Sequence, residues 1–256
     1  MHLHFCCFPG FLARVTLKLE DYLGEGFIDF LTKQGEHLEE VSVSCSTDSE
    51  EDFSHEYFVA GHADQQGQLF DLALLSVGLL AKRVTKLSLS GYGLVNSNAV
   101  KTMGLREKLD SPSWLRRQSC EWFSSLTNLT IMSYLPAMTV NSGLMRSVLI
   151  GARNLKILNI EGSFATFFTD IFLSSVLSSN PMERLHIIDI CSTGDDSIPL
   201  TCQTVRHLLD TCVRIREIWI ADWRISCSCI RELRKFVREN NWDVLITRKG
   251  TRMTSS

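Results

Sequence analysis

The apolar residues of the chain recur in a six-residue pattern, L-x-x-L-x-L, with gaps of three and then two residues. In VRIREIWIADWRIS, residues 213–226, the pattern falls on Ile215, Ile218 and Ile220. Neither the strict alternation of a strand nor the stripe of a helix accounts for this spacing over its whole length. Matching stretches are LARVTL (12–17), LEEVSV (38–43), VTKLSL (84–89), LTNLTI (126–131), LKILNI (155–160), MERLHI (182–187) and IREIWI (215–220). The recurrence predicts an internal structural repeat.

The spacing of these stretches supports a repeat of strand-plus-helix size. Their starting positions are separated by 26, 46, 42, 29, 27 and 33 residues. Four of these intervals are close to a repeat of about 20–29 residues, and the two longest indicate insertions. The final L-x-L of each hexamer alternates as a short strand, and the first apolar residue lies on the turn that enters it. Each repeat therefore contributes one strand to a parallel sheet.

Between the hexamers the apolar period becomes helical. Apolar residues three and four apart, often preceded by a Ser, Thr, Asp or Asn that can cap a helix, predict one helix after each strand. The segments are FIDFLTKQGEHL (27–38), LFDLALLSVGLLAKR (69–83), GLMRSVLIGARNL (143–155), DIFLSSVLSSNP (170–181), TVRHLLDTCVRI (204–215) and IRELRKFVREN (230–240). After the last of them, NWDVLI at 241–246 predicts an eighth strand near the end of the sheet.

A strand and helix of this size cannot bury their apolar faces alone, so the units are expected to stack. The chain resembles the leucine-rich repeat family over about residues 10–248. The expected fold is α/β: a leucine-rich repeat solenoid, or horseshoe, with a concave parallel sheet and outer helices. We expect one domain over residues 1–256, with short tails. Leu87, Leu129, Leu158 and Leu185 are expected in one continuous core.

Three helix ends resemble the cysteine-containing repeats of F-box/LRR proteins, C-x-x-L-x-x-L-x-L-x-x-C-x-x-I. These are QGEHLEEVSV, GARNLKILNI and TCVRIREIWIADWRIS. Cys212 takes the first cysteine position and Ile225 the last apolar one, while Trp223 stands at the second cysteine position. The other repeats place Ser46, Tyr92, Tyr134, Ser163 and Ile190 there, so the usual Asn or Cys ladder is largely missing.

The resemblance implies a non-enzymatic protein-interaction module, the substrate-recognition part of a cullin-RING ubiquitin ligase of the F-box type. No F-box segment opening with Leu-Pro precedes the first hexamer, which begins within a dozen residues of Met1. The first repeat also has no polar capping element, which terminal repeats need for solubility. We therefore expect a fragment, a truncated gene product or a subunit covered by a partner.

The cysteine content indicates the cellular compartment of the protein. Nine cysteines with no CxxC pair in a chain of 256 residues favour reduced thiols, and hence a cytoplasmic or nuclear location. MHLHFCCFPG makes a poor signal peptide, and the longest apolar run, at 69–81, is interrupted by Asp71 and too short to cross a bilayer. We expect no membrane association.

No motif favours an enzyme, a cofactor or a metal. His2, His4, Cys6 and Cys7 lack a second ligand pair, and GYGLVN (91–96) lacks the third glycine of a dinucleotide fingerprint. The adjacent Asp195 and Asp196 in STGDDS are typical of a turn, and the cysteines of the last two helices are typical of a core. The acidic cluster DSEED (48–52) is typical of a solvated loop.

Charge suggests an alternative function. The chain has a net charge of −3, but residues 201–256 hold 11 Lys and Arg against 6 Asp and Glu. This end includes Arg231, Arg234, Lys235, Arg238, Arg248, Lys249 and Arg252. The residues could form a patch for phosphates or an acidic protein, but Glu232 and Glu239 are interleaved, which favours a solvated helix face. A stand-alone scaffold or a nucleic-acid-associated protein is the alternative to the ligase, although nucleic acid is the less expected partner.

A protein partner is expected on the concave face. The residue between the last two apolar positions of each hexamer should point there, giving Thr16, Ser42, Ser88, Thr130, Asn159, His186 and Trp219. The face thus changes from small and polar to large and aromatic, and an exposed Trp on a rigid sheet is typical of an interface hot spot. The predicted partner-binding residues are His186, Trp219, Glu183, Arg184, Asp189, Arg216, Glu217, Asp222, Asn159 and Glu161. Alternatively, Trp219 covers the open end of the stack.

Overall fold

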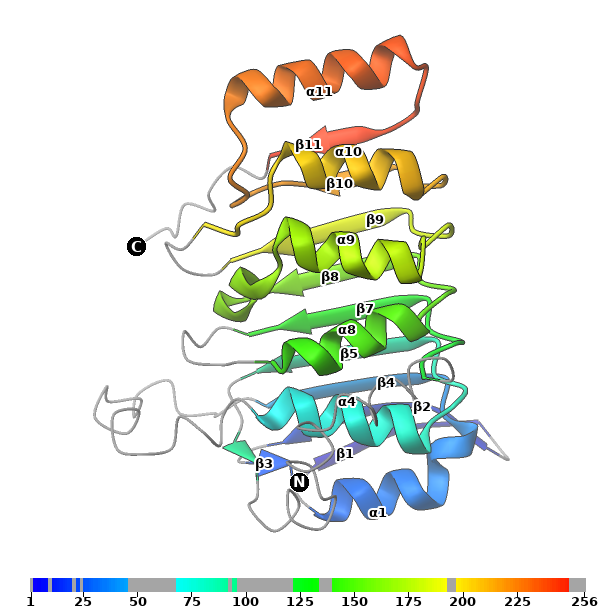
Figure 1. Cartoon of the computed structure of the whole chain (residues 1–256). Coiled ribbons are helices and arrows are strands. Elements are labelled where there is room, and N and C mark those ends of the chain that lie inside the picture. Colours follow the sequence, from blue (N-terminus) through cyan, green and yellow to red (C-terminus); the bar gives the residue numbers. More distant parts are fainter. Residues whose placement is uncertain are drawn as a thin grey trace, which may run out of the picture.

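The computed structural model describes residues 2–8, 11–19, 22–23, 25–45, 68–91, 94–95, 122–133, 140–192 and 197–248, and its main feature is one nine-stranded sheet. The strands are β1 (His2–Phe8), β2 (Phe11–Leu19), β4 (Glu40–Cys45), β5 (Lys86–Gly91), β7 (Asn128–Met132), β8 (Ile157–Glu161), β9 (Ile187–Cys191), β10 (Glu217–Trp219) and β11 (Leu245–Thr247). They lie side by side in chain order. Eight of them, β2 to β11, are parallel, and β1 is antiparallel to β2 (Figure 1).

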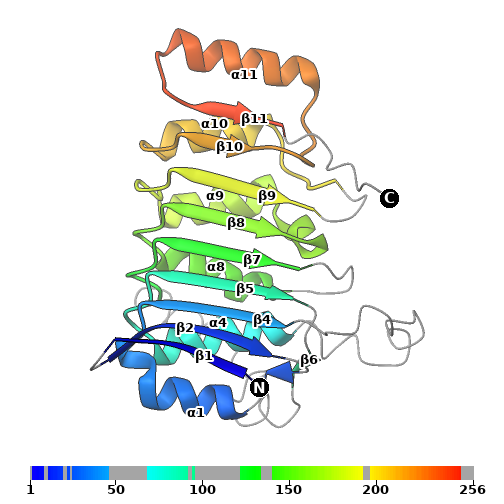
Figure 2. The same ribbon diagram turned by 180° about the vertical axis from the view of Figure 1, so that it is seen from behind.

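Helices pack on one face of this sheet. They are α1 (Glu25–Gln34), α4 (Gln68–Leu80), α8 (Ser142–Gly151), α9 (Asp170–Ser179), α10 (Cys202–Thr211) and α11 (Cys227–Glu239). Short 3-10 turns, η1 (Gly35–His37) and η2 (Ser163–Phe167), and a second pair of strands, β3 (Tyr22–Leu23) and β6 (Leu94–Val95), complete the described elements. Figure 1 shows the helices in front of the strands, and Figure 2 shows the opposite side, where no described helix lies over β4 to β10. We call this second side of the sheet the open face.

The apolar positions of the hexamers explain the register. The first row of aligned strand residues on the helix side is Val15, Val41, Leu87, Leu129, Leu158, Ile188, Ile218 and Ile246, all of them buried. A second buried row runs through Val43, Leu89, Ile131, Ile160 and Ile190. Because alternate residues of a strand face opposite sides, these rows join the helices in one core and leave the residues between them on the open face.

The expected helices, the strand at NWDVLI and the parallel sheet are confirmed. Leu87, Leu129, Leu158 and Leu185 belong to one buried cluster, as expected. Caps of the expected residue types are present: Asn141, Thr169, Thr201 and Ser226 each accept a hydrogen bond from a backbone N–H in the first turn of α8, α9, α10 and α11, respectively. These caps satisfy donors that a helix start would otherwise leave without a partner.

The expected alignment of the sixth hexamer is wrong by three residues. Strand β9 aligns Ile188 with Leu158 and Ile190 with Ile160, so the matching stretch is LHIIDI (185–190) and not MERLHI. Leu185 is therefore the residue on the turn that enters β9, and its side chain is fully buried. Met182 is also buried but has a positive φ of 46°, which a strand or helix does not use. A buried apolar residue three positions ahead of the true start created a second match to the pattern.

Strand β1 was not expected. HLHFCCF pairs antiparallel with β2, with His4 opposite Thr16 and Phe5 opposite Val15. The strand covers the edge of β2, which the parallel repeats leave without a neighbour on that side. Its sequence carries no L-x-x-L-x-L pattern, so a search for repeats does not find it.

Several sequence predictions lie outside the described residues. They concern the DSEED cluster, Asp195 and Asp196, Lys249 and Arg252, the Tyr92, Gly93 and Asn96 positions of GYGLVN, and the side chains of His2, His4, Cys6 and Cys7. Within the described part of the chain, no helix is long and apolar enough to span a membrane.

Candidate functional site

The open face changes character along the sheet. The central row of aligned open-face residues is Thr16, Ser42, Ser88, Thr130, Asn159, Asp189, Trp219 and Thr247. The expected change from small polar residues to larger ones is present, with one correction. Asp189, and not His186, lies between Asn159 and Trp219, because the register of β9 differs by three residues from the expected one.

A second row on the open face, two residues earlier on each strand, divides the sheet into a charged part and an apolar part. On the N-terminal strands, Glu40 forms ion pairs with Arg14 at 3.4 Å and with Lys86 at 2.8 Å. On the C-terminal strands the same row carries Ile157 and Ile187. Leu245 lies farther along this row, on β11, and its side chain is 56% exposed. An apolar side chain left this exposed on a sheet face is one that a partner can cover.

We call Ile157, Ile187, Trp219 and Leu245 the apolar patch. Sequence reasoning missed three of its members, because it followed only the central position of each hexamer. The signal was available: a residue two positions before the central one points to the same side of a strand. In IREIWI this position is Glu217. The hexamer that matches the pattern best therefore has a charged residue where the neighbouring strands have an apolar one.

The centre of the candidate site contains polar groups that are shielded from water. Asp189 is only 8% exposed, although it lies on the open face. The Oδ1 atom of Asn159, one strand away, is buried and accepts no hydrogen bond from the described residues. Buried acceptors are usually paired, so an unsatisfied amide oxygen here is unusual. A partner or an ordered water that donates to Asn159 would remove this cost.

Trp219 is half-buried and held by its own strand. Its Nε1 donates a hydrogen bond to Oε2 of Glu217 at 3.2 Å, two residues earlier on the same face. The bond orients the indole along β10 and occupies one carboxylate oxygen of Glu217. An oriented aromatic ring loses little conformational entropy when a partner covers it. Glu161, at the end of β8, completes the site as a half-buried acid on the next row.

The other predicted partner-binding residues do not lie on the open face. Glu183 and Arg184 are exposed on the turn between α9 and β9, before the strands begin. Asp222 lies past the opposite end of β10 and accepts a hydrogen bond from the backbone N–H of Ser192 at 3.0 Å. Its carboxylate therefore holds two loops together. His186 and Arg216 lie one residue before their strands, at the edge where the strands start.

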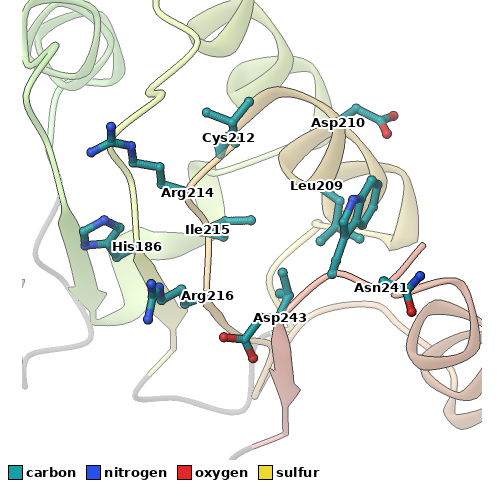
Figure 3. A pocket seen from close by; sticks show the side chains of 12 residues that line it. His186, Leu209, Asp210, Cys212, Arg214, Ile215, Arg216, Asn241 and Asp243 are labelled. Atoms are coloured by element: carbon teal, nitrogen blue, oxygen red, sulfur yellow. The ribbon is translucent and has the colours of Figure 1, made fainter. Parts of the chain in front are cut away.

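His186 and Arg216 line a pocket at that edge. The cavity of about 680 Å³ lies between the turn that enters β10 and the turn that enters β11. Figure 3 shows His186, Arg214 and Arg216 on one side, and Asp210 and Asn241 on the other. Leu209, Ile215, Trp242 and Val244 contribute apolar lining.

Two thiols of this region have raised pKa values. Burial raises the pKa of Cys212, which lines the pocket, to about 12. Burial, followed by a hydrogen bond with Cys202, raises the pKa of Cys229 to about 11. Thiols with such pKa values are poor nucleophiles at neutral pH. In the described part of the chain no three His, Cys, Asp or Glu side chains are grouped to hold a metal ion.

The basic C-terminal end is partly used within the fold. Arg234 donates from Nε and Nη2 to the carbonyl of Ile246, at 3.2 and 2.8 Å, and so ties α11 to β11. Lys235 pairs with Glu239 on the exposed side of α11 at 3.6 Å. Arg248 donates to the sulfur of Cys227 at 3.5 Å. Arg234, Lys235 and Arg248 thus contact three different neighbours within the fold.

Comparison of the sequence with protein-family models finds no matching family, and comparison with curated proteins finds no match.

Proposed function

We propose that the chain is a leucine-rich repeat solenoid that serves as a non-enzymatic protein-interaction module, with the apolar patch as its docking surface. The observation that carries the proposal is the change along the open face: ion-paired Arg14, Glu40 and Lys86 on the first strands give way to Ile157, Ile187, Trp219 and Leu245 on the last ones. An apolar centre with an oriented Trp and a polar rim is the usual composition of a protein interface.

The stacked order of the strands supports the solenoid. In a solenoid each repeat contacts its neighbours in sequence, so the strand order follows the chain order and one long sheet face is available to a partner. The described strands follow the chain order, and no described helix covers the open face over β4 to β10 (Figure 2). The resemblance of the repeats to F-box/LRR proteins suggests a particular role, recognition of a substrate for a cullin-RING ubiquitin ligase. A stand-alone scaffold is the alternative, since its docking surface would be the same.

The test is a quantitative affinity purification of the tagged chain from cells in three forms: unchanged, Trp219→Ala and Ile171→Ala. Ile171 is 83% exposed on α9, in the helix layer, so its variant removes an exposed apolar side chain away from the open face. Trp219→Ala should reduce recovery of at least one protein by about tenfold or more, as expected of a hot spot. Ile171→Ala should not, and the melting temperatures of all three forms should be nearly equal.

Two outcomes would contradict the proposal. If Trp219→Ala lowers the melting temperature strongly while recovery per folded molecule is unchanged, Trp219 is a structural cover for the end of the stack. If Ile171→Ala reduces recovery of the same protein as strongly as Trp219→Ala, docking does not use the open face. Recovery of a cullin subunit with the unchanged chain separates the ligase role from the scaffold role.

A further inference from the structure

Three side chains with basic groups follow one another along the edge where strands β8, β9 and β10 begin. The backbone N–H of His186 donates to the carbonyl of Lys156 at 2.8 Å, and the N–H of Arg216 donates to the carbonyl of His186 at 2.8 Å. The three residues thus occupy the same position on neighbouring turns, about 5 Å apart along the stack. We call Lys156, His186 and Arg216 the basic ladder.

Further arginines flank the ladder. Arg184 and Arg214 are exposed two residues before His186 and Arg216 on the same turns. None of the four Lys and Arg side chains forms an ion pair with a carboxylate of the described residues. Glu40 on the N-terminal strands, by contrast, is paired with a cation on each side. Unlike the cations that pair with Glu40, these four side chains keep their positive charge available to an anion of a partner.

The charges of the ladder act on one another. Burial, and then the positive charges of Arg216, Lys156 and Arg214, lower the pKa of His186 below its usual value of 6.5. The three cations that contribute to this lowering create a positive potential around His186, and this potential attracts an anion. The ladder therefore provides a favourable position for negative groups.

The pocket beside the ladder limits what kind of anion fits. It shares His186, Arg214 and Arg216 with the basic edge, and its remaining lining is apolar or acidic except for the amide of Asn241 (Figure 3). Asp210 and Asp243 would repel the evenly spaced phosphates of a nucleic acid that crossed the pocket. A peptide can place carboxylates on the ladder and an uncharged apolar side chain against Leu209 and Trp242.

We propose that the basic ladder and the adjoining pocket bind an acidic peptide segment, with its carboxylates on Lys156, Arg214 and Arg216 and an apolar side chain in the pocket. The proposal rests on the proposed function, because such a segment belongs to a protein partner docked on the open face. The peptide segment would add a second contact at the edge of the sheet. This contact is electrostatic, whereas the contact at the apolar patch is hydrophobic.

The test uses a fluorescein-labelled peptide of repeating Glu-Glu-Leu-Gly, with the full chain, in a fluorescence anisotropy titration. Lys156→Glu/Arg216→Glu should weaken binding by about tenfold or more, because reversed charges on a ladder repel the peptide. The matched control is Arg231→Glu/Lys235→Glu on the exposed side of α11, which changes the net charge equally and should alter the affinity by less than about twofold. The same peptide with Gln in place of Glu should not bind measurably.

Trp219→Ala separates this inference from the proposed function. It should leave the peptide affinity unchanged, since the indole lies on the open face and not at the ladder. Equal weakening by the ladder variant and its control would overturn the inference and reduce the effect to net charge. Tighter, ladder-dependent binding of a single-stranded oligonucleotide would overturn the choice of a peptide. Neither result would affect a Trp219-dependent partner found by affinity purification.

Discussion

The side chain of Asp71 accepts a hydrogen bond from the backbone N–H of Asn141 at 2.9 Å, joining α4 to the residue that caps α8. A similar contact occurs farther along, where Asp170 at the start of α9 accepts hydrogen bonds from the backbone N–H and the hydroxyl of Thr201, the cap of α10. In both places an aspartate near the start of one helix holds the start of the next described helix. The two differ in environment, because Asp71 is buried and Asp170 is only partly covered.

Burial makes Asp71 a source of pH-dependent stability. Burial raises its pKa from 3.8 to about 7, and the hydrogen bond from Asn141 offsets only part of that effect. The unfolded chain ionises at the lower value, so the stabilising effect of the protonated form is complete below about pH 4 and is lost as the pH rises through 7. Asp71→Asn should therefore gain stability relative to the unchanged chain between pH 5 and pH 8, by at most about 4 kcal/mol. Urea unfolding at a series of pH values measures this, and a difference that does not vary with pH would contradict it.

Asp170 gives the opposite dependence and serves as the control. Burial acts to raise its pKa, but the hydrogen bonds from Thr204 and Thr201 outweigh burial, and the pKa lies below its usual 3.8. Its stabilising effect is present above the unfolded value and is lost only as the pH falls through the folded pKa. Asp170→Asn should destabilise the chain by a constant amount from pH 5 to pH 8. A pH-dependent loss over that range would mean that Asp170 is not ionised in the folded state.

Truncation of the core tests the register. Leu158 is fully buried at the centre of the strand row that faces the helices, whereas its neighbour Ile157 lies on the open face. Leu158→Ala should lower the free energy of unfolding by about 2 to 5 kcal/mol, because it leaves a cavity among side chains that cannot close it. Ile157→Ala should cost clearly less. Coincident urea midpoints for Leu158→Ala and the unchanged chain would show that the register is wrong.

The indole of Trp223 joins two neighbouring repeats through a hydrogen bond. Trp223 is buried, and its Nε1 donates to the carbonyl of Ile190 in the preceding repeat at 2.7 Å. Trp223→Phe keeps the ring but leaves this carbonyl without its donor, which should cost about 1 to 3 kcal/mol by thermal or urea unfolding. Trp242→Phe is the matched control, because no hydrogen bond joins the Trp242 indole to the described residues. Equal effects of the two variants would assign the stabilising role to ring packing alone.

The elements of the fold were accessible from local sequence patterns. The buried rows through Leu129 and Leu158 follow directly from L-x-x-L-x-L, since alternation along a strand is a local property. The sixth repeat shows where the local pattern became ambiguous. Starting positions at Leu155, Leu185 and Ile215 give two even intervals of 30 residues, so comparison with neighbouring repeats would have selected LHIIDI over MERLHI.

The candidate site was predicted only in part, for a different reason. Trp219 and Asn159 follow from their own hexamers, but the apolar patch depends on which residues become neighbours across strands. Ile157 and Ile187 are 30 residues apart in the chain and side by side in the sheet. Strand β1 likewise depends on its pairing with the edge of β2. Both contacts depend on how separate strands pair with one another.

The sequence by itself determined the repeat, the type and order of most elements, and the side of each strand that is buried, because these depend on the periodicity of apolar residues within a few turns of chain. Tertiary structure alone decided which residues of different repeats lie next to each other. It brought Lys156, His186 and Arg216 into one ladder, placed Asp189 beside Trp219, and buried Asp71 against Asn141. Charge repulsion, burial and shifted pKa values depend on distances through space, and stacking of the repeats sets those distances.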